Sequence, residues 1–388
     1  MDRDWANLPK HLLDSVVETL VLPTHYVRFS LVCKSWYSVA KDNKNKHVRM
    51  TAPMLLIYSG KKDYWNLYNI DSNKVLDLQV RVPNKRLCGS SKGWLIFVDR
   101  NDVDKNFGVT LVNPFFRVKG RREKANSFIR LPPLMPPGWE KWFKRCEDYV
   151  FKATISADPI LNPEDCIVMV IHLERLQLAF IRLGKDTTWT YMNEKDNIVL
   201  GCQMIQEVIK IEDTFYAVSY SNKLYTFDVN SQSYSNVQLV VPENEPIGLI
   251  KRYIFEGEGK SLLMVQRYME YEGDDYKRVT KKFRVFELNS HKGEWVEKSS
   301  LGDIALFVGD NSSISVLPSN ISGCQSNCIY FNHDCDHILF LNAPHDFGIY
   351  NVVDQIFLET YPAHFKKLMK RSWELLPIWV IPTLYLQL

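Results

Sequence analysis

The sequence predicts a mainly β protein with a small α-helical module at its N-terminal end. Aromatic residues make up 13% of the 388 residues, and such side chains are enriched in strands because they fit a pleated surface. Apolar residues recur at three- and four-residue steps only in about the first fifty positions, which indicates helices there. From Met54 onward, short apolar runs alternate with turn residues, as is typical of strands.

Composition excludes several classes of protein. Hydrophobic residues reach 46% and charged residues 24%, which is ordinary for a globular chain. The net charge of +3 gives no strong field for nucleic acid or an anionic membrane, so neither is expected as a partner. We find no apolar run long enough for a spanning helix and no signal-peptide core after the charged start. A location in the cytoplasm and/or nucleus is expected, with the eight cysteines reduced.

Residues 5–42 are predicted to be helical. Leu8-Pro9 opens a first helix, because proline is favoured in a first turn. Pro23 is expected to end that run, Thr24 to cap a second helix and Ser35 to cap a third, short one. The first helix places its apolar residues on one face: Leu12, Leu13, Val16, Val17 and Leu20.

Three helices in under about fifty residues cannot bury all of these apolar side chains among themselves. Part of the apolar face must therefore be covered by something else. Either the helices form a cap that packs on the rest of the chain, or they dock onto a separate protein.

The N-terminal pattern resembles the F-box. The match comprises an opening Leu-Pro, an aliphatic ladder, and a Val-Cys-Lys-x-Trp signature that ends at Trp36, with Arg28 upstream. One departure is His11, where many F-boxes carry an acidic residue. The resemblance implies docking onto a Skp-type adaptor, which holds the module to a cullin scaffold. It places seven residues in or beside the adaptor interface: Leu8, Pro9, Leu13, Val16, Val32, Cys33 and Trp36.

A two-strand unit recurs through the remainder of the chain. Six units over about 300 residues give about 50 residues each, the size of a four-stranded kelch-type blade. The sequence thus predicts a kelch-like β-propeller of about six blades. Seven blades and a two-sheet sandwich are the alternatives. The uncharged segment Leu375 to Leu386 is expected to form a final strand that closes the ring against an early blade. The first strands of the units begin at Met54, Gly93, Cys166, Thr214, Ser261 and Cys328.

This region is similar to the plant F-box proteins with a C-terminal kelch-like β-propeller of formerly unknown function. Segments that carry the resemblance include Gly89 to Leu95, Leu111 to Pro114 and Leu301 to Gly309. The resemblance implies two domains, an F-box helical module over residues 1–48 and a substrate-recognition propeller over residues 49–388. It implies no named substrate, and no substrate-binding residues are assigned.

Three other constellations are weaker. Gly259-Lys260-Ser261 lacks the earlier glycine and the following helix of a phosphate-binding loop. The basic run Arg117 to Lys124 is a candidate import signal or a solvated loop. A zinc site is considered and set aside in favour of a hairpin tip, because the strand spacing suits tetrahedral ligation poorly. Its candidate ligands are Cys324, Cys328, His333, Cys335 and His337.

No nucleophile elbow or zinc-protease helix is present, so no catalytic residue, metal or cofactor is predicted. The leading hypothesis is a non-catalytic, substrate-recognition subunit of a Skp–cullin–F-box ubiquitin ligase that recruits an unknown protein substrate. The alternative is a propeller enzyme or metabolite-binding protein with a helical cap. A protein that binds the adaptor without assembling a ligase also fits this sequence.

Overall fold

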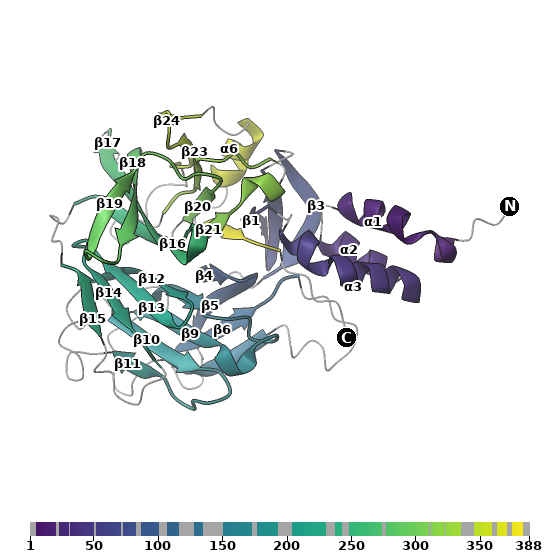
Figure 1. Cartoon of the computed structure of the whole chain (residues 1–388), viewed down its shortest axis with the longest axis horizontal. Helices are drawn as coiled ribbons and strands as arrows, with labels where there is room; N and C mark the ends of the chain where they lie inside the picture. The colour runs from purple at the N-terminus through teal and green to yellow at the C-terminus, as the bar shows by residue number, and fades with distance from the viewer. Residues whose placement is uncertain are drawn as a thin grey trace.

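A ring of β-sheets with a group of helices at one side makes up the chain, shown as a computed structural model in Figure 1. The structure describes residues 5–20, 23–30, 32–49, 52–70, 73–82, 87–100, 107–115, 128–134, 150–172, 177–192, 204–229, 237–242, 248–273, 277–309, 312–321, 323–334, 345–358, 363–370 and 375–382. None of the helices in these ranges has the length and apolar character needed to span a membrane.

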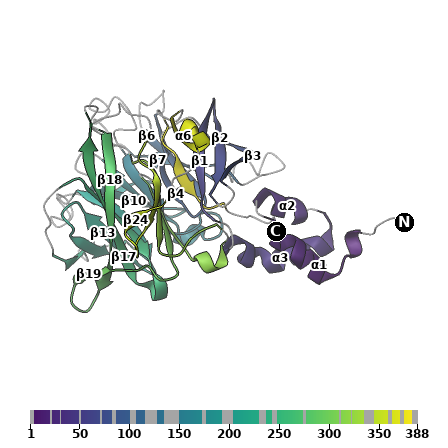
Figure 2. The ribbon, with the colours of Figure 1, turned by 90° about the horizontal axis from the view of Figure 1, so that it is seen from above.

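The N-terminal module has its own small core. It consists of η1 (Trp5–Asn7), α1 (Lys10–Glu18), α2 (Pro23–Ser30) and α3 (Lys34–Arg49). Figures 1 and 2 show the three helices beside the ring rather than over its centre. Among the described residues, the core of the module contains only side chains of the module itself: Leu13, Val17, Tyr26, Phe29, Val39 and Ala40.

The helix boundaries correct two predictions. Pro23 opens α2, so Thr24 lies inside its first turn; proline is tolerated there because that N–H needs no helical partner. The third helix has 16 residues rather than a few, and Ser35 lies within its first turn. Its apolar periodicity ends early, but a polar contact holds it to α1: Asn43 donates to Asp14 at 2.7 Å.

Six sheets form the blades of a propeller, which confirms the predicted fold class and the lower blade number among the described strands. In each sheet the first strand named lines the centre. The first blade contains β25 (Ile378–Val380), β1 (Met54–Lys61), β2 (Tyr64–Asn69) and β3 (Lys74–Arg81). The second contains β4 (Leu87–Ser91), β5 (Trp94–Arg100), β6 (Phe107–Val112) and β7 (Phe128–Pro133). The third contains β8 (Val150–Ile155), β9 (Ile167–His172), β10 (Gln177–Arg182) and β11 (Thr190–Met192).

The other three blades follow in chain order. The fourth contains β12 (Ile205–Ile211), β13 (Thr214–Ser219), β14 (Leu224–Phe227) and β15 (Gln238–Val241). The fifth contains β16 (Ile250–Glu256), β17 (Leu262–Glu272), β18 (Lys277–Asn289) and β19 (Glu294–Lys298). The sixth contains β21 (Ser312–Val316), β20 (Ala305–Gly309), β22 (Cys328–Phe331), β23 (Gly348–Asn351) and β24 (Ile356–Phe357). Every predicted two-strand unit falls on neighbouring strands of one blade.

The ring closes as the sequence predicts. β25 pairs antiparallel with β1, with Met54 opposite Val380 and Leu56 opposite Ile378. Trp379 is fully buried, and its Nε1 donates to the carbonyl of Val308 in the sixth blade at 3.1 Å. The last described strand therefore supplies the inner strand of the first blade and fastens it to the sixth.

Two features of the ring were not expected. β20 and β22 run parallel, and β21 folds back to become the inner strand of the sixth blade. A helix, α6 (Ala363–Lys370), follows that blade. Phe365 and Met369 lie one turn apart on its buried side, and the Phe365 ring packs 4.5 Å from the ring of Tyr68.

The inner strands approach each other closely. A Cβ atom at Gly89 would lie 2.1 Å from the carbonyl oxygen of Ala153, so only glycine fits where β4 meets β8. The core lies between neighbouring blades, and each interface forms a cluster of buried apolar side chains. The centre of the ring is lined by strands that carry charged and hydroxyl side chains.

Candidate functional site

Two apolar stripes run side by side along α1, about 100° apart around the helix. Leu13 and Val17 are 1% and 2% exposed and fill the core of the module. Leu12 and Val16 form the neighbouring stripe and are 44% and 37% exposed, next to the exposed Pro9. Residues three and four positions apart share a helix face, so Pro9, Leu12 and Val16 form one surface stripe.

The structure divides the seven predicted interface residues by accessibility. Pro9, Val16 and Val32 are exposed, whereas Leu8, Cys33 and Trp36 are half-buried. Leu13 packs inside the module, beneath the exposed residues. The adaptor contact of all seven stays a prediction.

Trp36 has a structural role in addition to any surface one. Its ring packs 4.6 Å from the ring of Phe29, and its Nε1 donates to the carbonyl of Trp5 at 2.9 Å. The side chain therefore ties η1 to α3. Leu12 was not among the predicted interface residues, although it is exposed in the same surface stripe as Pro9 and Val16.

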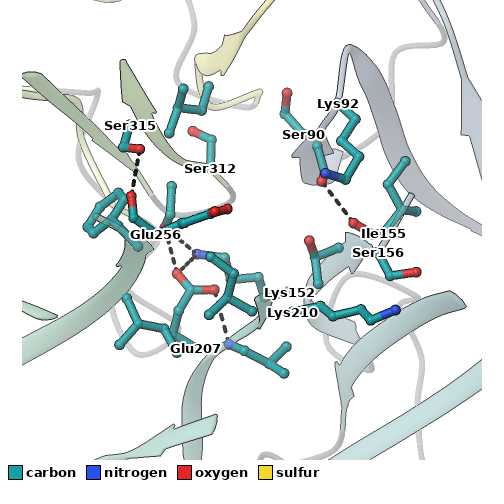
Figure 3. Close-up of a pocket in the computed structure, with 18 of the residues that line it drawn as sticks. Ser90, Lys92, Lys152, Ile155, Ser156, Glu207, Lys210, Glu256, Ser312 and Ser315 are labelled. Atoms are coloured by element: carbon teal, nitrogen blue, oxygen red, sulfur yellow. Dashed lines mark hydrogen bonds and ion pairs between the residues drawn. The ribbon is translucent and has the colours of Figure 1, made fainter. Parts of the chain in front are cut away.

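The propeller contains a second candidate site, a cavity of about 260 Å³ in its central channel. Figure 3 shows the lining, which comes from the inner strands β4, β8, β12, β16 and β21 together with Ile381. β1 begins where β25 ends, since Met54 pairs with Val380. The cavity therefore opens at the end of the channel where residues 52–54 lead from the module into the first blade.

An ion pair forms the floor of this cavity. Lys152 of the third blade contacts Glu207 of the fourth, and their side chains are only 5% and 4% exposed. Ser313, from the sixth blade on the far side of the ring, donates to Glu207 at 2.6 Å and accepts from Lys152 at 3.3 Å. The backbone N–H of Val208 also donates to Glu207, at 3.2 Å. Every one of these contacts compensates charge that would otherwise be costly to bury.

A larger charge cluster is buried between the fifth and sixth blades. Arg267 is completely buried and contacts Asp334 at 2.9 Å and Asp346 at 2.8 Å. Thr280 accepts from Arg267 at 2.7 Å and donates to Asp346 at 2.7 Å. Burial opposes the charge of Arg267, but Asp346 and Asp334 outweigh it and hold the pKa of the guanidinium above its ordinary value. Tyr253 completes the cluster by donating to Asp334.

The candidate metal ligands that the structure describes do not form a metal site. Cys335 and His337 lie outside the described residues, and among the described ones no three His, Cys, Asp or Glu side chains could hold an ion together. Burial, with a smaller effect of Asp354, raises the pKa of the Cys328 thiol to about 11, which disfavours the thiolate that zinc requires. His333 is buried against the ring of His345 at 4.7 Å.

Of the two remaining weak motifs, the structure describes the glycine motif, which forms no phosphate-binding loop. Gly259 and Lys260 belong to η5 (Glu258–Lys260), which leads into strand β17 instead of a helix, and Lys260 pairs with Glu212. The basic run over residues 117–124 lies outside the described residues.

Comparison with known proteins adds the family. The F-box domain matches residues 5–48, and the KIB1-4 beta-propeller matches residues 67–351. F-box protein SKIP23 of Arabidopsis thaliana is 24% identical over 367 residues, covering 85% of this chain and 84% of its own length. An Arabidopsis thaliana F-box/kelch-repeat protein is 25% identical over 341 residues and covers 85% of this chain and 84% of its own length. With its propeller closed around a polar channel and its helices set to one side, the chain belongs to the KIB1-4 beta-propeller family and joins that propeller to an F-box domain.

Proposed function

We propose that the chain is the substrate-recognition subunit of a Skp–cullin–F-box ubiquitin ligase. In this role the helical module binds a Skp-type adaptor, the adaptor binds a cullin scaffold, and the propeller binds a protein target. The chain performs no bond chemistry itself. It raises the effective concentration of the target at the ubiquitin-loaded enzyme, which accelerates transfer without any new catalytic group.

One observation carries the proposal: an F-box domain whose own core leaves an apolar surface exposed. Trp5, Leu12 and Val32 are 57%, 44% and 53% exposed. In so small a module, exposed apolar side chains of this size indicate an interaction surface. Exposed Leu, Val and Trp side chains surrounded by polar residues are what a desolvated binding centre is built from. The F-box match over residues 5–48 selects a Skp-type adaptor as the occupant.

Affinity purification with a Skp-type adaptor tests the interface. Leu12→Asp and Val32→Asp should each weaken adaptor binding at least about tenfold, because a charge would be buried against an apolar partner. Val353→Asp is the matched control, since Val353 is also 53% exposed but lies on the propeller. Undiminished adaptor binding by both module variants would refute the interface. So would an equal loss in the Val353 variant.

Reconstituted ubiquitination separates a ligase subunit from a protein that only sequesters the adaptor. The full chain, the adaptor, the cullin and its catalytic partners should together modify target proteins captured by the propeller. A complex that forms normally but modifies no captured protein would favour sequestration.

The alternative function, a propeller enzyme or metabolite-binding protein, required the helices to form a cap over the propeller. The described core of the helices instead contains only their own residues. The polar channel is a feature that suits small-molecule binding, and its occupant is the subject of the next inference.

A further inference from the structure

The cavity in the central channel is a blind cup. Its floor is the Lys152, Glu207 and Ser313 cluster, which joins three blades across the ring. Its walls are the ends of the inner strands, and its mouth faces the side on which the chain leaves the module. The charges in the floor already pair with each other. They therefore close the bottom of the cup and are not free to bind a ligand.

Two lysines lie above the floor, and one hydroxyl is buried out of reach of the cavity. Lys92 is exposed at the rim and has no ion pair with any described residue. Lys210 lines the wall with a side chain only 15% exposed, and its printed partner is Asp213, which is 98% exposed and 3.9 Å away. Ser312 is 1% exposed, and its hydroxyl has no hydrogen-bond partner within the described part of the chain.

The acceptor in the floor is already engaged, because Glu207 accepts from Lys152, from Ser313 and from the backbone of Val208. Glu256 is exposed at the rim. The described lining carries three lysines, Lys92, Lys152 and Lys210, against these two glutamates. This excess of positive charge favours a ligand that brings negative charge and several acceptor oxygens.

The volume limits the size of that ligand. A water molecule occupies about 30 Å³ in the liquid, so a cavity of about 260 Å³ holds a single side chain or a small anion but no folded segment. Drug-sized ligands usually need more than about 300 Å³.

We infer that the cup receives an anionic side chain, a carboxylate or a phosphoester, from an extended segment of the protein target. Lys92 and Lys210, which line the cavity, bind its oxygens. This inference rests on the proposed role of the propeller in target binding. It assigns that binding to the channel end nearest the F-box module, where the target is held on the adaptor side of the ring.

Four matched peptides test the inference on the full chain. Each is an acetylated, amidated Gly-Ser-Xaa-Ser-Gly with a fluorophore, in which Xaa is phosphoserine, glutamate, alanine or lysine. Fluorescence anisotropy should show at least one anionic peptide binding about tenfold more tightly than the alanine and lysine peptides, with affinity falling as salt is added. Equal binding of all four, tighter binding of the lysine peptide, or no measurable binding of either anionic peptide would overturn the inference.

Variants locate the binding. Lys92→Ala and Lys210→Ala should each weaken the anionic peptide about tenfold, as expected for the loss of one charge-assisted hydrogen bond. Ser312→Ala should leave peptide binding unchanged, because its hydroxyl is buried out of reach of the cavity. The control is Lys62→Ala, which removes the same charge from an exposed turn away from the cup and should leave binding unchanged. Equal effects of Lys62→Ala and Lys92→Ala would overturn the assignment to the cup.

Two further arms separate the sources of failure. Inorganic phosphate should compete only weakly with the phosphoserine peptide; competition as strong as that of the unlabelled peptide would assign a free anion instead of a target side chain. Adaptor binding by the Lys92 and Lys210 variants should be normal. Loss of peptide binding with intact adaptor binding concerns the cup alone, whereas loss of adaptor binding by the wild-type chain would remove the proposed function itself.

Discussion

The helical module and the propeller depart from the usual distribution of side chains in opposite ways. The module exposes apolar groups such as Trp5 and Leu12, whereas the propeller buries charged ones such as Arg267 and Asp334. Exposed apolar groups in so small a core indicate that an outside partner completes the module. Buried charges indicate that the propeller uses ion pairs to fix its blades, at a desolvation cost that only complete pairing offsets.

Replacement of Arg267 tests the role of the buried charges in the propeller and should give the largest change in stability. Arg267→Met leaves Asp346 buried without its cation and leaves Asp334 with Lys251 alone, 3.4 Å away. The free energy of unfolding should therefore fall by about 3–5 kcal/mol. Urea denaturation measures the change. Arg284→Met is the control, because its partner Glu297 is half-exposed and the pair should contribute less than about 1 kcal/mol. Similar losses of stability in the two variants would show that the buried cluster contributes no more to stability than an exposed ion pair.

Two adjacent leucines test the module. Leu13→Ala empties a buried position and should lower the stability of the module by about 3 kcal/mol. Leu12→Ala should change it by less than about 0.5 kcal/mol, because Leu12 is exposed. Amide hydrogen exchange in α1 of the full chain reports both. Adaptor binding should show the opposite order at temperatures where both variants are folded. Faster exchange in the Leu12 variant than in the Leu13 variant would reverse the orientation of α1.

Two buried histidines of the propeller should make its stability depend on pH. Burial lowers the pKa of His172 to about 4; the pKa of His333 also falls to about 4, through burial and then through His345. Both groups bind protons more weakly in the folded state than in the unfolded chain, so stability is full above about pH 6.5 and falls as the pH drops toward 4.

Each histidine should lower the free energy of unfolding by about 2 kcal/mol between pH 7.5 and pH 5. Urea titrations at the two pH values measure this, and His172→Gln should remove about half of the difference. A pH dependence that survives replacement of both histidines would place the titrating groups elsewhere.

Ser312 and Ser313 provide the finest test, because they are neighbours with different bonding. Ser313→Ala removes a bridge between Lys152 and Glu207 and should cost about 1–2 kcal/mol. Ser312→Ala removes an unpaired hydroxyl and should be neutral or slightly stabilising. Thermal unfolding compares the two. A larger loss for Ser312→Ala would mean that its hydroxyl already has a structural partner.

Most of the fold could be predicted because its signals are local. Period-two strands and turn residues identify the six units, and the apolar segment around Trp379 indicates the closing strand. The helix α6 was missed because eight residues give little periodicity, and only Phe365 and Met369 mark its buried face. The length of α3 was missed because a polar contact through Asn43, and not apolar spacing, holds its second half to α1.

The channel could not be assigned from sequence because its residues come from different blades. Lys152, Glu207 and Ser313 are up to 161 positions apart, and only the closed ring brings them together. A signal was nevertheless present. Lys152 and Glu207 each place a charge in the short strand just before a recurring unit. A charge in the inner strand of a blade is costly unless it faces a partner or a cavity.

Pairing between β25 and β1 has a consequence for synthesis of the protein. The F-box module leaves the ribosome more than three hundred residues before the strand that completes the first blade. The module is therefore able to fold while the propeller is still an open arc. A premature stop codon between the end of α3 and Ile378 would release a chain that carries the whole helical module without a closed ring. Such a product would compete for the adaptor without delivering a target.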